Sequence, residues 1–156
     1  MATNSSDGIV RLWDLKTGHM LMELEGRGPA MQDMALSWDG KLIVSIDDEG
    51  YVVAWHGDTG RRLIQAFEPF PGSKGFCPLD ISPDGTMIAI GSYLTGHGTT
   101  LWNTETWQRK DTLRHDGAVT CVRYSPSGEL LAIGTASDRI FIWNPATKQC
   151  ITSLAS

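Results

Sequence analysis

Residues 113–144 read "LRHDGAVTCVRYSPSGELLAIGTASDRIFIWN" and set the pattern for the whole chain. Apolar residues follow the form Val119-x-x-Val122-x-Tyr124 before the turn "SPSG", and the runs "ELLAIGT" and "RIFIW" come after it. Alternation of apolar and polar residues with a period of two is typical of half-buried strands, and Ser, Pro and Gly between such runs favour tight turns. The stretch therefore predicts short antiparallel strands, and nothing in it has a helical period.

The same pattern recurs along the 156 residues of the chain. A tryptophan closes an apolar run at intervals of 41 to 47 residues, and a threonine follows four residues after each: Trp13, Trp55, Trp102 and Trp143. The turns "SWDG", "SPDG" and "SPSG" precede the last three of them. A period of this length indicates a repeat architecture. We expect each unit to be four short strands, the last of them in runs such as "RRLIQAF" and "KQCITSL".

Units of this length and strand content, together with the pair Trp13-Asp14, resemble the WD-repeat family of β-propellers. The resemblance implies an all-β fold, namely a partial WD-repeat β-propeller with four-stranded antiparallel blades. The expected divisions are a c–d half blade at 1–26 and full blades at 27–67, 68–113 and 114–156.

About three and a half blades cannot close a ring, because propellers are typically built from 4–8 blades. The chain is therefore expected to be a fragment of a longer propeller protein or one partner in a homo-oligomer that completes the ring. In the last two blades, Val122, Tyr124, Ile140, Ile142, Leu79, Ile81 and Leu101 are expected to be buried.

Composition excludes several function classes. The net charge is −5 and basic residues come in pairs at most, which argues against nucleic-acid binding through phosphates. No apolar run approaches the roughly 20 residues of a membrane helix, and "MATNSSDG" is not a signal peptide, so we expect no membrane contact and a cytoplasmic or nuclear location. Cys77, Cys121 and Cys150 lack metal-ligand spacing, so neither a metal nor a cofactor is expected.

His115 is the most tempting catalytic residue, because Thr135 or Ser137 and Asp138 could complete a nucleophile triad with it. The family resemblance implies a structural role instead. In WD repeats a histidine, a strand hydroxyl, a turn aspartate and a tryptophan form a buried hydrogen-bonded network, which here would be His115, Thr135, Asp138 and Trp143. Phosphate-loop, zinc-protease and serine-hydrolase motifs are absent, so we expect no enzyme and no catalytic residue.

Two lengthened connections are the candidate binding surface. The segments "EPFPGSKG" at 68–75 and "YLTGHG" at 93–98 should emerge at the same end of one blade. The residues expected to contact a protein partner, of unknown identity, are Phe70, Pro71, Lys74, Tyr93, Leu94 and His97. The favoured function is a non-enzymatic protein–protein interaction scaffold. The alternative is a glycan or small-ligand binding propeller module, in which Trp38, Trp107 and Tyr93 would stack on sugar rings.

Overall fold

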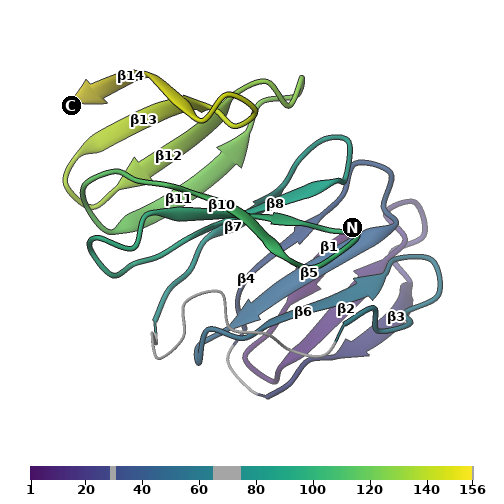
Figure 1. Ribbon diagram of the computed structural model, residues 1–156. Helices are drawn as coiled ribbons and strands as arrows, with labels where there is room; N and C mark the ends of the chain where they lie inside the picture. The colour runs from purple at the N-terminus through teal and green to yellow at the C-terminus, as the bar shows by residue number, and fades with distance from the viewer. Residues whose placement is uncertain (29–30, 65–74, 156) are drawn as a thin grey trace.

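Figure 1 shows the computed structural model, which describes residues 1–28, 31–64 and 75–155. In these residues the strands form four antiparallel sheets. The first two sheets contain β1 (Ala2–Asn4), β2 (Ile9–Trp13) and β3 (Met20–Glu25), then β4 (Met31–Leu36), β5 (Leu42–Asp47) and β6 (Val52–His56). The third contains β7 (Leu79–Ile81), β8 (Met87–Gly91), β9 (Thr99–Asn103) and β10 (Arg109–Leu113). The fourth contains β11 (Val119–Tyr124), β12 (Leu131–Thr135), β13 (Arg139–Asn144) and β14 (Gln149–Ala155).

Strands in every sheet pair in chain order, so each sheet is a meander, and the predicted all-β, propeller-like fold is confirmed. The third and fourth sheets have the four strands expected of a blade. In the second sheet, the run 61–67 was expected to be a strand. Within the described residues it contributes a single bridge between Arg62 and Trp55, and 65–67 lie outside those residues.

The Ser-x-x-Gly turns owe their recurrence to one set of hydrogen bonds. In the third sheet the Ser82 hydroxyl donates to the Asp84 carboxylate and accepts the backbone N–H of Met87 at 3.0 Å. Gly85 has a φ of 74°, a left-handed conformation that strains residues carrying a Cβ. The first turns of the second and fourth sheets repeat the arrangement around Ser37 and Ser125. The turn residues thus define where the first strand of each of these three sheets ends.

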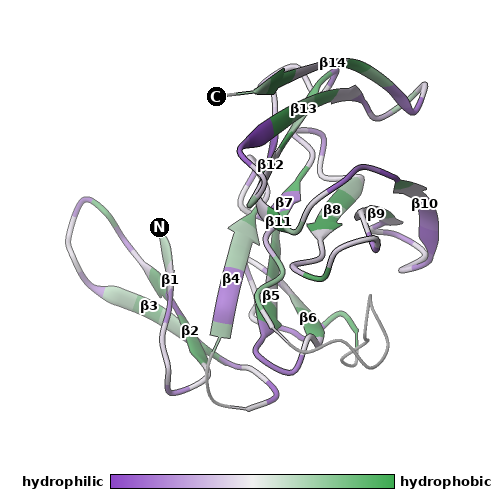
Figure 2. Cartoon of the chain, turned by 90° about the vertical axis from the view of Figure 1, so that its left-hand side faces the viewer, coloured by the Kyte–Doolittle hydropathy of each residue, from purple (hydrophilic) through white to green (hydrophobic). Residues whose placement is uncertain are grey.

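Adjacent sheets pack face to face, and a separate hydrophobic core fills each of the three interfaces. The second sheet is buried on both faces: Ile43, Val53 and Trp55 pack toward the first sheet, whereas Val44 and Val52 pack toward the third. Figure 2 shows the contrast between hydrophobic β8 and hydrophilic β10, which forms an edge of the third sheet. Burial therefore decreases from the middle of a sheet toward this outer edge.

Within the described residues, the fourth sheet is covered on one face only. Phe141 and Trp143 of β13 are buried against the third sheet, together with Val122. Their neighbours point the other way, so Ile142 is half-buried and Ile140 is 46% exposed. The expectation that Ile140 is buried is therefore wrong, because no described sheet covers that face. The burial of Val122, Leu79, Ile81 and Leu101 is confirmed, and Tyr124 is half-buried.

The first strands of neighbouring sheets lie side by side, β4 next to β7 and β7 next to β11 (Figure 1). Two aspartates join them. The Asp33 carboxylate accepts the backbone N–H of Leu79 at 3.0 Å, and the Asp80 carboxylate accepts that of Tyr124 at 2.7 Å. Burial raises the pKa of Asp80, and the hydrogen bond from Tyr124 opposes that effect. Each carboxylate thus links one sheet to the next.

Candidate functional site

The connection between β8 and β9, residues 92–98, is held firmly at its base. Ser92 is buried, and its N–H donates to the carbonyl of Gly98 at 3.1 Å. Its carbonyl accepts the N–H of Val119 at 2.8 Å, and its hydroxyl accepts the N–H of Leu94 at 3.1 Å. One residue therefore ties the loop to the fourth sheet and also fixes the start of the loop itself.

The tip of this loop presents its side chains to solvent. Tyr93 is 49% exposed, Leu94 is 41% exposed, and His97 is exposed as well. The loop returns through Gly98, whose φ is 72° and where an added Cβ would lie 2.4 Å from the Leu113 carbonyl oxygen. A larger residue at Gly98 would therefore displace the loop. The structure thus brings three predicted contact residues together, while Phe70, Pro71 and Lys74 lie outside the described residues.

A cavity of about 450 Å³ adjoins the loop at Gly96. Its other lining residues come from the link before β11 and from the fourth sheet: Arg114, His115, Asp116, Phe141, Trp143 and Cys150. The His115 ring stacks on Phe141 with centroids 5.4 Å apart. The exposed loop therefore continues into a hollow with an aromatic wall.

No hydrogen bond joins any two of the four residues expected to form one network. His115 Nε2 lies 3.0 Å from the hydroxyl of Thr99, in the third sheet, and burial lowers the pKa of His115. Thr135 instead contacts the Ser137 hydroxyl at 3.0 Å, and Asp138 is exposed. The indole N–H of Trp143 is buried and has no hydrogen-bond partner among the described residues.

Strand register explains why the Thr135 hydroxyl does not accept a hydrogen bond from the Trp143 indole. Trp143 lies opposite Leu131, so its diagonal neighbour on the same face is Ile133, not Thr135. In the first sheet the equivalent position is Thr3, and there the Trp13 indole donates to the threonine hydroxyl at 2.8 Å. A hydroxyl ten residues before the tryptophan is the sequence signal that could have revealed this contact.

Two more features were not anticipated. In the second sheet the hydroxyl at the equivalent position, Ser45, has no partner among the described residues. The hydrogen bonds from Asp33 and Asp80 to the following sheet could not be predicted from a common spacing in the sequence. Asp33 lies four residues before the serine of its turn, whereas Asp80 lies two residues before the serine of its turn.

Comparison with known proteins bears on residues 107–144, which match the WD domain, G-beta repeat family. This stretch of the chain is thus similar to a single WD repeat. The chain is similar to Periodic tryptophan protein 2 of Arabidopsis thaliana, with 24% identity over 145 residues. That alignment covers 92% of the chain and 16% of the relative, so the chain spans a small part of the relative's length. The matched repeat contains the stretch that carries the predicted strand pattern.

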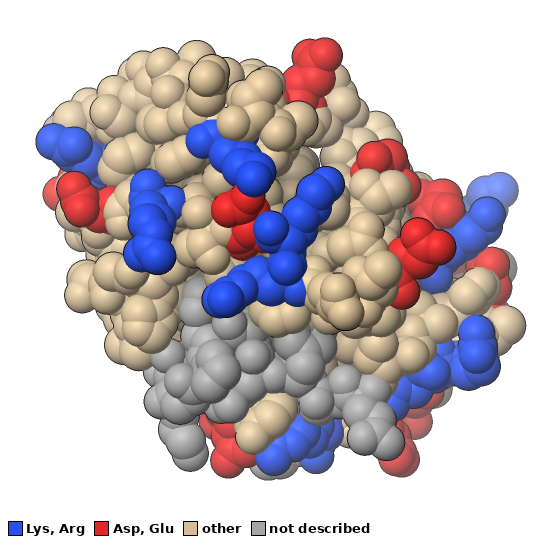
Figure 3. All heavy atoms as spheres, in the orientation of Figure 1, with Lys and Arg blue, Asp and Glu red and all other residues tan. Residues whose placement is uncertain are grey.

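The described sheets carry few groups suited to chemistry. Among residues 1–28, 31–64 and 75–155, no three His, Cys, Asp or Glu side chains gather where they could hold a metal ion. Burial raises the pKa of the Cys77 thiol. On the face seen in Figure 3, Lys and Arg are interspersed with Asp and Glu. The described part of the chain has no helix that could span a membrane.

Proposed function

We propose that this chain is a non-enzymatic WD-repeat module that binds protein partners, and that the loop at 92–98 contacts the partner. The observation that supports this most directly is the contrast within that loop. Its base is fixed by the hydrogen bonds of Ser92, whereas its tip exposes the apolar side chains Tyr93 and Leu94. WD repeats in general mediate protein–protein interactions, which agrees with this use of the loop.

The physical argument rests on the small cost of ordering such a loop. Association loses affinity when flexible segments must be immobilised, and a loop with a fixed base has already lost most of that freedom. Tyrosine is enriched at interface hot spots because it buries a large area with few rotatable bonds. The neighbouring cavity at Arg114 and Phe141 enlarges the surface beyond the loop tip.

The test compares two variants in a proteomic pull-down followed by titration of a purified partner. Tyr93→Ala with Leu94→Ala removes the exposed apolar tip. Trp38→Ala is the control, because Trp38 is 69% exposed but lies in a different connection. It stands in the β4–β5 turn, which joins the first and second strands of the second sheet, whereas the loop at 92–98 joins the second and third strands of the third sheet. We expect the loop variant to lose a partner that the parent and the Trp38 variant both retain. Retention of every partner by the loop variant would rule this surface out.

A further inference from the structure

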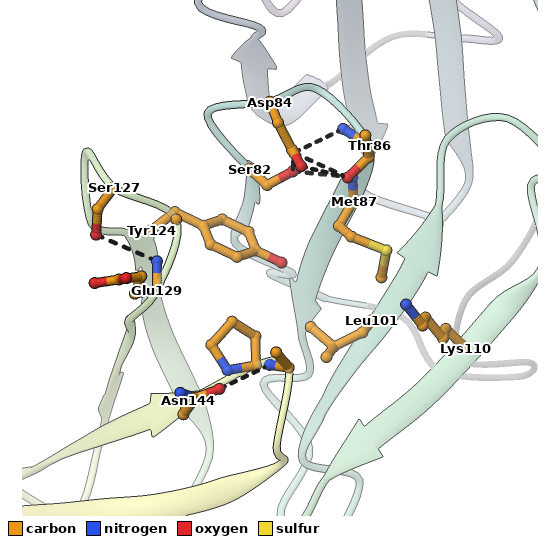
Figure 4. Close-up of a pocket in the computed structure, with 13 residues that line it drawn as sticks. Ser82, Asp84, Thr86, Met87, Leu101, Lys110, Tyr124, Ser127, Glu129 and Asn144 are labelled. Atoms are coloured by element: carbon orange, nitrogen blue, oxygen red, sulfur yellow. Dashed lines mark hydrogen bonds between the residues drawn. The ribbon is translucent and has the colours of Figure 1, made fainter.

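The fourth sheet has a cavity on each of its faces. The cavity on the covered face, of about 460 Å³, lies at one end of the packed third and fourth sheets, where Leu101 and Tyr124 project into it and Lys110 lines its side (Figure 4). Its lining residues come from both sheets, so packing within the chain accounts for it. The cavity on the other face, of about 340 Å³, is lined by strands and turns of the fourth sheet alone. It is therefore open to whatever covers that face.

The uncovered face of the fourth sheet has a ridge beside a trough. Strand register places Gly134 opposite Ile140, and Ile140 opposite Leu154, so these three residues share the uncovered face. Ile140 of β13 and Leu154 of β14 are exposed aliphatic side chains, whereas β12 contributes the small residues Ala132 and Gly134. The cavity of about 340 Å³ is lined by Gly134 and by both aliphatic side chains. One half of the face is therefore raised and aliphatic, and the other half is low.

The third sheet shows what a glycine at this position accommodates. Gly91 is the counterpart of Gly134, because each glycine pairs with the residue three positions before the tryptophan of its sheet. Val119 of the facing fourth sheet packs so closely over Gly91 that an added Cβ would lie 2.4 Å from its Cγ1. At Gly134 the nearest atoms to an added Cβ lie 3.6 Å away and belong to the same sheet. An aliphatic side chain from a facing sheet therefore fits over Gly134.

The first sheet also has a face that no described sheet covers, but that face is charged. Val10 packs toward the second sheet, so its neighbour Arg11 points the other way, where Asp7 holds it at 2.7 Å and Glu23 at 2.9 Å. Covering these ion pairs with isoleucine and leucine would remove charged groups from water at a cost in free energy. Contact between the first sheet of one copy and the fourth sheet of another is therefore unfavourable.

The rim of the cavity at Gly134 is electrically balanced. Its charged lining residues are Asp138 and Arg139, which are adjacent in the chain and opposite in sign. The chain as a whole has a net charge of −5, so two copies repel each other over much of their surface. Two copies of the uncovered face of the fourth sheet, in contrast, meet without net repulsion.

We propose that the uncovered face of the fourth sheet binds the same face of a second copy of this chain. A two-fold axis parallel to the strands lies between the copies, so the ridge of each copy enters the trough of the other. Ile140 and Leu154 then pack over Gly134 of the second copy, as Val119 packs over Gly91 within the chain. This closed pair uses one face twice and leaves the first sheet free, which distinguishes it from a ring of blades.

The experiment is sedimentation equilibrium of the whole chain at micromolar concentrations. We expect a monomer–dimer equilibrium without larger species, because both copies use the same face. Leu154→Lys changes two symmetry-related contacts in each dimer, so the dissociation constant should rise about 100-fold, roughly tenfold for each copy changed. A heterodimer of parent and variant should therefore dissociate with a constant about tenfold above the parental one. Leu21→Lys is the matched control, because Leu21 is also exposed and lies on β3, the last strand of the first sheet.

Gly134→Val tests the trough itself. The new side chain fills the cavity from its own sheet, so dimerisation should weaken about as much as in Leu154→Lys. The atoms around the added Cβ lie at ordinary contact distance, and valine suits a strand, so the urea midpoint of the dilute monomer should not fall. A loss of dimerisation without a loss of stability separates docking from folding.

Each outcome decides the question. Assemblies larger than a dimer, or an equal loss with Leu21→Lys, would show contact between unlike sheets and overturn the proposal. A parental chain that stays monomeric, or undiminished dimerisation of Leu154→Lys or Gly134→Val, would overturn it as well. The proposal does not depend on the loop at 92–98, and Tyr93→Ala should leave the dimer unchanged, so failure of the loop surface and failure of this face are distinguishable.

Discussion

The unpartnered indole of Trp143 gives a quantitative test of the register argument. Replacing Ile133 with threonine places a hydroxyl where Thr3 stands in the first sheet, within reach of the buried N–H. Threonine is preferred to serine because its β-branch restricts χ1, and the hydroxyl of Ser45 makes no bond at the equivalent position.

The magnitude follows from two terms. Ile133 is fully buried, so shortening it to valine costs about 1 kcal/mol of unfolding free energy. Exchanging a valine methyl for a hydroxyl costs a further 1–3 kcal/mol, roughly, when the hydroxyl finds no partner. At residue 133 the hydroxyl and the indole N–H satisfy each other, so this second cost disappears. We therefore expect Ile133→Thr to cost about as much as Ile133→Val, namely about 1 kcal/mol.

Ile90 supplies the matched control, because it is equally buried and occupies the equivalent position in the third sheet. There the Trp102 indole already donates to Thr100 at 2.9 Å, so no donor awaits a new hydroxyl. Ile90→Thr should therefore cost about 1–3 kcal/mol more than Ile90→Val. Urea unfolding monitored by circular dichroism measures all four variants. An equal Thr–Val difference at residues 90 and 133 would refute the reasoning.

Three further outcomes are expected. His115→Ala should lower the unfolding free energy by about 1–3 kcal/mol, because the stack on Phe141 and the bond to Thr99 are lost; unchanged urea midpoints would contradict this. Because burial lowers the folded-state pKa of His115, the unfolded chain binds its proton more readily, and parental stability should fall as pH drops below the ordinary histidine pKa of about 6.5. His115→Gln should flatten this decline, and parallel urea titrations over that pH range check it. The chain should associate at micromolar concentrations through the open face at Ile140 and Leu154, and Ile140→Lys should weaken association; light scattering that finds a stable parental monomer would contradict this.

Local patterns predicted the strands because the forces that define them are local. The alternation before "SPDG" placed Leu79 and Ile81 in the core, and the turn serines and glycines marked where strands end. Ile140 alternates just as well, yet it is exposed, because its burial depends on a neighbouring sheet and not on its own strand.

The site was less predictable for a related reason. The exposed loop at 93–98 was predicted from its length, because this connection is longer than the corresponding connections in the other units. The pairing of His115 with Thr135 considered a single unit, whereas in the structure His115 Nε2 lies 3.0 Å from the hydroxyl of Thr99, which belongs to the preceding sheet. The cavity at Tyr124 and Lys110 joins residues from two units, so no single repeat contains its pattern.

The burial of the second sheet on both faces also has a consequence for the order in which the chain comes apart. In a linear array each unit is stabilised by its neighbours, so terminal units, with one neighbour, open at lower free energy than internal ones. The backbone amides of β5 and β6 should accordingly exchange with solvent only in the rarest openings, whereas β14, exposed along its whole length, frays often. A protease added to this chain would then cleave β14 before it cleaves β5 or β6.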